Sequence, residues 1–283
     1  MTAYFLITSY GRTATTWLAH TLAPLDGVSV SHGPLPIPIT TERPKHPSVA
    51  DQHRFLGELP KITLAQYLET LRQAQPDARV VGNVHAFTAG DLASRKNEKL
   101  PQPLGTMNIT RHPITRVESF HRHWMREAAE SPDYHAVENK NFYNSEFCQW
   151  ISQRLPKVQD LSPESTTTFL RATATVLATD RSELELEPNQ IMTMERLTRE
   201  PEAFQSLLRL VTQDSIPIET SFIESAIESD AKNKSTGDAA ISKQTWESWA
   251  DWQRSAFRLT ANALEVSLEK YQRLHYDLQF VGN

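Results

Sequence analysis

A cation and several hydroxyl groups lie close together near the start of the 283-residue chain. An arginine guanidinium makes charge-assisted hydrogen bonds to oxyanions, and hydroxyl groups add further donors. If this segment leads into a helix, the N–H groups at the helix start bind anions as well. The sequence therefore predicts an anion site here; the alternative is that Thr13 or Thr15 caps the helix and Arg12 is solvated. The segment consists of Tyr10, Gly11, Arg12, Thr13, Ala14, Thr15, Thr16 and Trp17.

The segment 10–17 differs from the Walker A loop of ATP- and GTP-binding proteins. That loop requires a second glycine followed by a lysine and a serine or threonine. Neither that glycine nor the lysine is present here, which weakens an ATPase or kinase assignment. A position directly after the first strand of a sheet still favours a nucleotide as the ligand.

A second arginine and hydroxyl occur together later in the chain. Arg111 would follow the carboxyl end of a strand, where ligands of α/β proteins bind. Ser119 lies eight residues later, in the second turn of the helix that Pro113 would begin. The pair can hold a second phosphate; the alternative is an ion pair for Arg111 and a solvated helix face for Ser119.

Together these two segments resemble the sulfotransferases that use 3′-phosphoadenosine 5′-phosphosulfate (PAPS). Residues 10–17 resemble their phosphosulfate-binding loop, Tyr-Pro-Lys-Ser-Gly-Thr-Thr-Trp. Residues 111–119 resemble their 3′-phosphate motif, which has Arg-x-Pro and a serine eight residues after the arginine. Looser similarities extend over most of the chain. Residues 81–85 stand in the place of the family's Lys-Thr-His strand end, and residues 191–202 resemble its Tyr-Glu-Asp-Leu…Asp-Pro-Glu stretch. The tryptophan-bearing segment that ends at 276 resembles the closing helix of the family.

The chain also departs from the family pattern. Arg12 stands where many members have a catalytic lysine, and Thr13-Ala14 replaces Ser-Gly. Met194 replaces a tyrosine that helps to place the adenine in cytosolic members. The Arg-Lys-Gly segment of the family has no clean counterpart. These differences affect the catalytic cation, the space beside the phosphosulfate and the adenine contacts.

The resemblance implies transfer of a sulfuryl group from PAPS to a hydroxyl or amine of a small-molecule or saccharide acceptor, with release of adenosine 3′,5′-bisphosphate. Arg12 and residues 13–17 would hold the phosphosulfate, and Arg111 and Ser119 the 3′-phosphate. His85 matches the family's histidine and is the expected base, although His32 could also face the acceptor. No metal is required.

Two other functions stay open from the sequence. The first is a nucleotide-binding phosphotransferase, such as a kinase, built on the same sheet. The second is a non-catalytic descendant that binds a nucleotide or a protein partner. Stronger binding of ATP with magnesium would favour the first, and cofactor binding without turnover would favour the second.

These residues require strands and helices that alternate along the chain. The pattern predicts a single α/β domain over 1–283, with a central, doubly wound parallel sheet flanked by helices, as in the P-loop-like sulfotransferase fold. Polar or proline-rich loops are expected at 32–60 and 131–145 and would line the acceptor side. Strands are expected at 4–8, 28–31, 79–84, 106–110 and 190–194. Helices are expected at 14–22, 63–74, 113–127, 146–155, 166–178, around 204–211 and at 245–274.

Composition narrows the remaining classes of protein. A net charge of −5 argues against a general nucleic-acid binder. Cys148 is the only cysteine, so no intrachain disulfide can form. No apolar run approaches the ~18 residues of a membrane span, and the first residues lack signal-peptide features. A cytoplasmic enzyme is expected, and a homodimer stays open.

Overall fold

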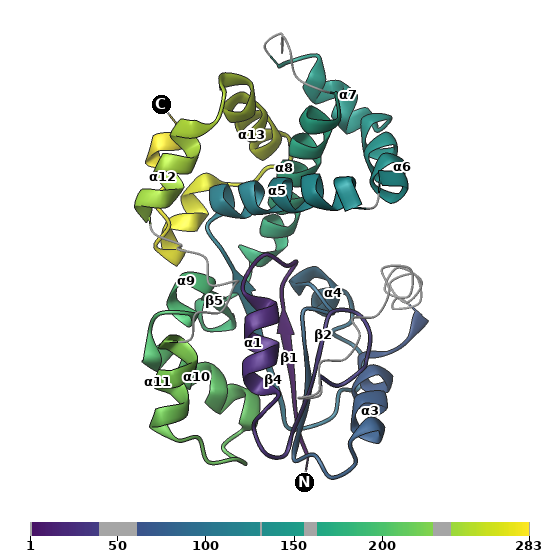
Figure 1. Cartoon of the computed structure of the whole chain (residues 1–283), viewed down its shortest axis with the longest axis vertical. Helices are drawn as coiled ribbons and strands as arrows, with labels where there is room; N and C mark the ends of the chain where they lie inside the picture. The colour runs from purple at the N-terminus through teal and green to yellow at the C-terminus, as the bar shows by residue number, and fades with distance from the viewer. Residues whose placement is uncertain (1, 40–60, 131, 156–162, 229–238, 283) are drawn as a thin grey trace. The chain divides into compact units, whose positions relative to one another are not determined.

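The structure, a computed structural model, describes residues 2–39, 61–130, 132–155, 163–228 and 239–282 (Figure 1). Its contacts divide the chain into two compact units. Unit 1 consists of Met1–Thr110 and Asn189–Ser235, and unit 2 of Arg111–Pro188 and Thr236–Asn283.

Unit 1 is built on a sheet of five parallel strands in the order β2-β3-β1-β4-β5. The chain first winds from β1 toward β2 and β3, then crosses to β4 and β5 on the other side of β1. The carboxyl ends of β1 and β4 therefore form the switch point at which such sheets bind ligands. The strands are β1 (Ala3–Thr8), β2 (Val28–His32), β3 (Val80–Val84), β4 (Leu104–Thr110) and β5 (Ile191–Thr193).

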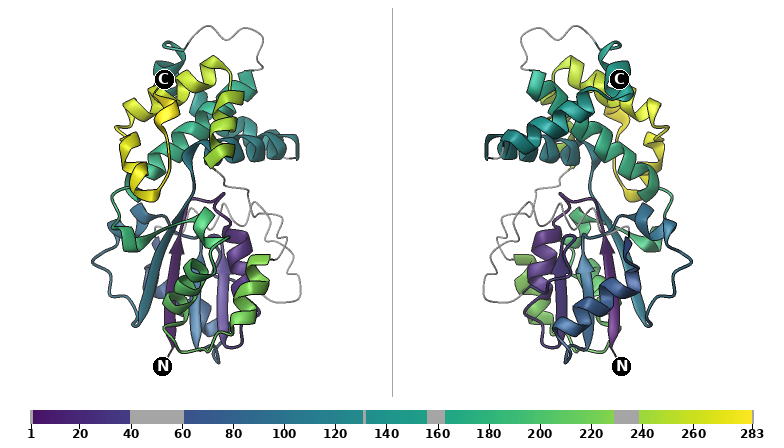
Figure 2. Two further views of the ribbon diagram at one scale, coloured as in Figure 1. Left: turned by 90° about the vertical axis from the view of Figure 1, so that its left-hand side faces the viewer. Right: turned by 90° about the vertical axis from the view of Figure 1, so that its right-hand side faces the viewer.

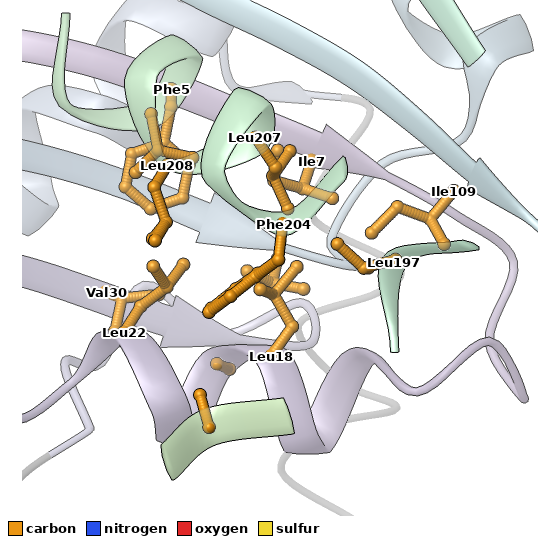
Figure 3. Packing of buried hydrophobic residues seen from close by; sticks show 14 of the residues in the cluster. Phe5, Ile7, Leu18, Leu22, Val30, Ile109, Leu197, Phe204, Leu207 and Leu208 are labelled. Atoms are coloured by element: carbon orange, nitrogen blue, oxygen red, sulfur yellow. The ribbon is translucent and has the colours of Figure 1, made fainter. Parts of the chain in front are cut away.

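Helices α1 (Thr15–Leu22) and α10 (Pro201–Thr212) cover one face of this sheet. Their apolar side chains meet those of β1 in one continuous cluster (Figure 3). A buried side chain of this size stabilises the fold by about 1.5–3 kcal/mol, so the cluster holds the start of α1 firmly against β1. The cluster includes Phe5, Ile7, Leu18, Leu22, Phe204, Leu207 and Leu208.

Helix α3 (Leu64–Ala74) covers the opposite face, where Leu6 of β1 packs against Tyr67. Figure 2 shows α10 in front of the strands in one view and α3 in front in the opposite view. Thr63 begins α3 with a capping box, since Thr63 Oγ1 accepts from the N–H of Gln66 at 3.1 Å and the Gln66 side chain accepts from Thr63 at 2.8 Å. The expected central parallel sheet flanked by helices is thus confirmed.

The pairing of β1 with β3 depends on a glycine. Gly82 lies opposite Phe5, and a Cβ atom at this position would be 2.4 Å from the Phe5 ring. Only glycine leaves room for that ring against the strand. The shorter elements of unit 1 are α4 (Ala89–Ser94), α9 (Met194–Leu197) and α11 (Thr220–Glu228), and the 3₁₀ helix η2 (Pro188–Gln190) leads into β5.

Unit 2 is helical in the part that the structure describes. Its longest helices, α5 and α8, pack against each other. The α-helices are α5 (Pro113–Glu130), α6 (Pro132–Tyr143), α7 (Glu146–Ser152), α8 (Pro163–Glu183), α12 (Ala239–Ser248) and α13 (Asp251–Ala263). Two 3₁₀ helices follow, η3 (Leu268–Leu274) and η4 (Gln279–Val281).

The prediction of a loop over 131–145 is wrong, because α6 occupies most of that segment. Pro132 begins the helix, where its missing N–H has no cost, and Asp133 complements the positive end of the helix dipole. The segment is polar because much of α6 is exposed. Of the other expected loop, residues 40–60 lie outside the described residues, and His32 ends β2.

The prediction of a single helix over 245–274 is also wrong. Helix α12 ends at Ser248, and Ala250 is the N-cap of α13, where the Gln253 side chain accepts from its N–H at 2.9 Å. The expected core stripe is nevertheless mostly buried, at Trp249, Trp252, Ala256 and Val266. The apolar spacing continues across a capped break in the helix.

Candidate functional site

The loop between β1 and α1 has an unusual backbone. Gly11, Arg12 and Ala14 all have positive φ, at 93°, 57° and 58°. A residue with a side chain pays about 1–2 kcal/mol for this left-handed region, so two such residues in one short loop store strain. Strain of this kind persists where the surrounding structure imposes it, often at ligand sites. The turn also resembles the backbone concavities in which N–H groups bind anions.

Two buried hydroxyl groups hold this loop in shape. The hydroxyls of Ser9 and Thr13 are hydrogen-bonded to each other, and both residues are almost fully buried. Ser9 Oγ also accepts from the N–H of Gly11 at 3.1 Å. The Thr13 hydroxyl therefore closes the loop, and sequence reasoning missed the matching role of Ser9.

Helix α1 begins without a side-chain cap. Its N-cap is Ala14, which makes no capping hydrogen bond, and its first turn contains no acidic residue. The expected alternative, in which Thr13 or Thr15 caps the helix, is wrong. The first N–H groups of a helix have no partner within the helix and carry partial positive charge. The arrangement suits an anionic ligand at the start of α1.

His85 follows the last residue of β3 and is fixed by two contacts with the β1 segment. Its backbone N–H donates to the oxygen of Ile7 at 2.9 Å, and its Nδ1 lies 3.0 Å from the backbone oxygen of Ser9. A carbonyl oxygen can only accept, so Nδ1 carries the proton and donates. In the neutral ring, Nε2 is then the nitrogen that can accept a proton. An imidazole held in this way can accept a proton at a fixed position. The backbone of His85 has a positive φ of 81°.

His32 is the last residue of β2, the strand that pairs with β3. Its Nε2 lies 3.2 Å from Thr15 Oγ1 and 3.5 Å from Thr16 Oγ1. The rings of His32 and His85 are 5.6 Å apart between centroids and inclined by 33°. Both imidazoles are thus held at the carboxyl ends of adjacent strands, and His32 contacts the first turn of α1.

Asn83 fixes the ends of the two histidine-bearing strands. Its Nδ2 lies 2.7 Å from Ser31 Oγ, 2.8 Å from the Tyr67 hydroxyl and 3.0 Å from the oxygen of Gly33. Its Oδ1 accepts from the N–H of Ala86 at 2.6 Å. This buried amide therefore orders the backbone on both sides of the histidines. Sequence reasoning assigned it no role.

Arg111 and Ser119 lie in unit 2, at the start of α5, whereas residues 12–17, His32 and His85 lie in unit 1. Arg111 is 8% exposed, and its Nε donates to Thr115 Oγ1 at 3.1 Å. Thr115 and Ser119 are four residues apart and so lie on one helix face. Thr115 therefore links Arg111 to the helix face that carries Ser119. Thr115 lies four residues after Arg111 and four before Ser119, and the sequence analysis missed this signal.

The start of α5 is anchored to the C-terminal segment through His112. Its ring packs against Tyr276 and Phe280, with centroids 5.1 and 6.4 Å away, and its Nε2 lies 3.5 Å from the oxygen of Asp277. Burial lowers the pKa of His112 to about 4, so the imidazole is neutral at neutral pH. The loosely family-like segment ending at Tyr276 thus supports the residue next to Arg111.

A buried ionic cluster ties α5 to α8 and η3. Arg116 Nη1 donates to Asp180 at 2.6 Å and to Glu183 at 3.0 Å, and the Tyr271 hydroxyl is hydrogen-bonded to Asp180. Two carboxylates therefore share one guanidinium out of contact with water. Burial raises the pKa of Asp180 to about 7. The cluster is a strong structural tie one turn after His112.

The adenine-side position of the family pattern is part of the core in this chain. Met194, which stands where the family has a tyrosine near the adenine, is fully buried in the core of unit 1. Among the described residues, no group of three or more His, Cys, Asp or Glu is placed to bind a metal ion. In the same part of the chain, no helix is both long enough and apolar enough to span a membrane.

Comparisons with known proteins found similarity among solved structures alone: no family model and no curated protein matches the chain. The chain is similar to a sulfotransferase domain from the curacin biosynthetic pathway, with a TM-score of 0.45, 14% identity, and coverage of 95% of this chain and 99% of that one. It is also similar to mouse sulfotransferase SULT7A1 complexed with PAP, with a TM-score of 0.48, 9% identity, and coverage of 98% and 89%. Both are sulfotransferases, the family that the sequence motifs resemble. At these identities no residue role passes from those proteins to this chain.

Proposed function

We propose that this protein is a sulfotransferase that transfers a sulfuryl group from PAPS to a hydroxyl or amine of a small-molecule or saccharide acceptor and releases adenosine 3′,5′-bisphosphate. The observation that carries the proposal is the β1–α1 loop. It combines left-handed residues, an uncapped helix start and Arg12 at the carboxyl end of the central strand. Such a loop fits the phosphosulfate of PAPS, and its sequence resembles the family's phosphosulfate loop.

In this proposal the loop stabilises charge as the sulfuryl group leaves the phosphate. Like phosphoryl transfer, the reaction is an in-line displacement with negative charge on the equatorial and leaving oxygens. Arg12 and the N–H groups at the start of α1 supply preorganised positive charge there. Arginine keeps its proton at any working pH, so Arg12 acts by electrostatics and hydrogen bonding.

His85 is the proposed base. As the acceptor oxygen or nitrogen attacks sulfur, it must lose a proton, and a positioned histidine accelerates such a transfer by roughly 10²–10⁴-fold. The hydrogen bond from Nδ1 to Ser9 directs the proton-accepting role to Nε2. That bond also ties the base to the loop that would hold the phosphosulfate.

Arg111 and Ser119 are the proposed ligands of the 3′-phosphate. Their support is local: a buried guanidinium whose Nε is fixed by Thr115, and a serine one turn further along the same face of α5. With Nε bound to Thr115, phosphate contacts would use the Nη groups. A guanidinium held in this way is well suited to bidentate binding of a phosphate.

A thermal-shift titration tests the proposal. Adenosine 3′,5′-bisphosphate at ~100 times its dissociation constant should stabilise the fold by about 2.7 kcal/mol, whereas AMP at the same concentration should shift it less. Transfer of radiolabelled sulfuryl from PAPS to a panel of phenols, alcohols, amines and saccharides then tests turnover. A shift with ATP and magnesium but none with the bisphosphate would overturn the proposal in favour of a phosphotransferase. Binding without transfer to any acceptor would indicate a non-catalytic protein.

A further inference from the structure

We infer that His32 is a positioning residue for the anion at the start of α1: it donates from Nε2 to the Thr15 hydroxyl and so directs the proton of that hydroxyl toward the anion. The inference rests on the proposed function only in placing an anion at the β1–α1 loop. It concerns a histidine that is distinct from the proposed base.

The hydrogen-bond chemistry of His32, Thr15 and the anion leaves one consistent arrangement. A threonine hydroxyl has a single proton to donate and two lone pairs with which to accept. Phosphate and sulfuryl oxygens only accept, so a hydroxyl that binds them must give them its proton. Thr15 Oγ1 lies 3.2 Å from His32 Nε2, within hydrogen-bond range. When the Thr15 hydroxyl donates its hydrogen bond to the anion, it can only accept from His32, so His32 Nε2 must be the donor.

The fold holds His32 in place for this role before any ligand binds. His32 ends β2 in register with Val84 of β3. Asn83 Nδ2 fixes the neighbouring backbone by donating to the oxygens of Ser31 and Gly33, at 3.4 and 3.0 Å. A donor fixed in this way stabilises charge without reorganising during the reaction. Thr16, at 3.5 Å, is the more distant partner and would be affected less.

The two histidines thereby take opposite roles although their rings are only 5.6 Å apart. His85 donates from Nδ1 to Ser9, which makes its Nε2 the acceptor. His32 donates from Nε2 to Thr15. If Nε2 of His32 instead accepted a proton, it could no longer turn the Thr15 proton toward the anion. Donation to Thr15 and action as a base therefore exclude each other at this atom.

Variants of His32 and Thr15 in the full chain test the inference through affinity for adenosine 3′,5′-bisphosphate, measured by calorimetry. His32→Leu removes the donor and should weaken binding roughly 10-fold, in line with a lost hydrogen bond to a charged system. His32→Gln places an amide N–H near the position of Nε2 and should stay within about 3-fold of wild type. Thr15→Val should match His32→Leu, and the double variant should be little worse than either, because both remove one chain of hydrogen bonds.

Thr21→Val is the matched control on α1. Its hydroxyl donates back to the Trp17 oxygen at 2.8 Å, away from the anion, so its loss should leave bisphosphate affinity unchanged. Wild-type affinity in His32→Leu, additive losses in the double variant, or a fall in kcat with unchanged bisphosphate affinity would each overturn the inference. If wild type binds ATP and not the bisphosphate, the proposed function fails. The same five variants measured with ATP then still decide the role of His32.

Discussion

The Nδ1 atom of His85 donates a hydrogen bond to the backbone oxygen of Ser9 across 3.0 Å. This bond joins the end of β3 to the first residue after β1, so the orientation of the imidazole and the shape of the β1–α1 loop depend on each other. A substitution at His85 therefore has two separable effects. One is the loss of Nε2 as a base, and the other is the loss of a support for the loop.

Replacing His85 with asparagine should separate these effects. The asparagine Nδ2 reaches about as far as the imidazole Nδ1 and can donate to Ser9, and asparagine tolerates a positive φ. His85→Asn should therefore keep bisphosphate affinity while turnover falls by roughly 10²–10⁴-fold. His85→Ala should lose turnover and weaken bisphosphate binding as well. Steady-state kinetics and calorimetry measure the two quantities. Normal turnover in His85→Asn would move the base elsewhere.

Ala14→Gly should stabilise the protein, because it relieves the left-handed backbone at the N-cap of α1. Relief of about 1–2 kcal/mol is offset by the roughly 0.5–1 kcal/mol that glycine costs through its greater freedom when unfolded. The expected net gain is therefore up to about 1.5 kcal/mol in the free energy of unfolding, measured by denaturant titration.

Ala19→Gly is the matched control for that change. Ala19 is buried in the middle of the same helix, where glycine costs about 1 kcal/mol relative to alanine. The two substitutions should therefore change stability in opposite directions. Equal losses would mean that residue 14 does not adopt a left-handed backbone in solution.

Removing the Thr115 hydroxyl should reduce the preference for a 3′-phosphate. Thr115→Val removes the acceptor that holds Arg111 Nε, and Thr115→Ser keeps it. The ratio of affinities for adenosine 3′,5′-bisphosphate and AMP should fall about 10-fold in Thr115→Val and more in Arg111→Ala, which loses the charge itself. Thr115→Ser should keep the wild-type ratio. An unchanged ratio in Arg111→Ala would show that the 3′-phosphate binds elsewhere.

The β1–loop–α1 unit could be predicted from the sequence, because its signals are local. A β-rich apolar run is followed by a turn that contains Gly11, and a cation with hydroxyls then leads into a helical pattern. The partners of those hydroxyls could not be predicted. Thr13 bonds to Ser9 across a loop whose left-handed residues carry no clear signal in the sequence. Thr15 contacts His32 because contacts distant in sequence place β1 and β2 in the same parallel sheet.

The helix break at Trp249 shows why the C-terminal prediction failed. The spacing of three between Trp249 and Trp252 fits a helix, and both rings are buried. Nevertheless α13 begins anew after Ala250, a residue type that rarely caps helices. The available signal was Gln253, three residues after the cap, as in a capping box. Periodicity identified the buried face but could not detect the interruption.

The Arg116 cluster should make stability depend on pH through Asp180. Burial raises the pKa of this carboxyl from 3.8 to about 7. The folded protein therefore holds the Asp180 proton more tightly than the unfolded chain does. The contribution of protonated Asp180 to the free energy of unfolding is fully present below about pH 4, and it is lost as pH rises toward 7. Asp180→Asn cannot titrate. Its free energy of unfolding, relative to wild type, should therefore rise between pH 4 and 7, by on the order of a few kcal/mol at most.

The comparison must be with wild type at each pH, because buried and half-buried histidines act in the opposite direction. Burial lowers the pKa of His112, His121 and His135, so each reduces stability as pH falls below about 6.5. These contributions are the same in both proteins and cancel in the difference. Glu185→Gln changes an exposed carboxylate whose pKa is lowered by Lys270, and it should leave the difference flat above pH 5. Parallel curves for Asp180→Asn and wild type would show that Asp180 is ionised throughout, with Arg116 balancing both carboxylates.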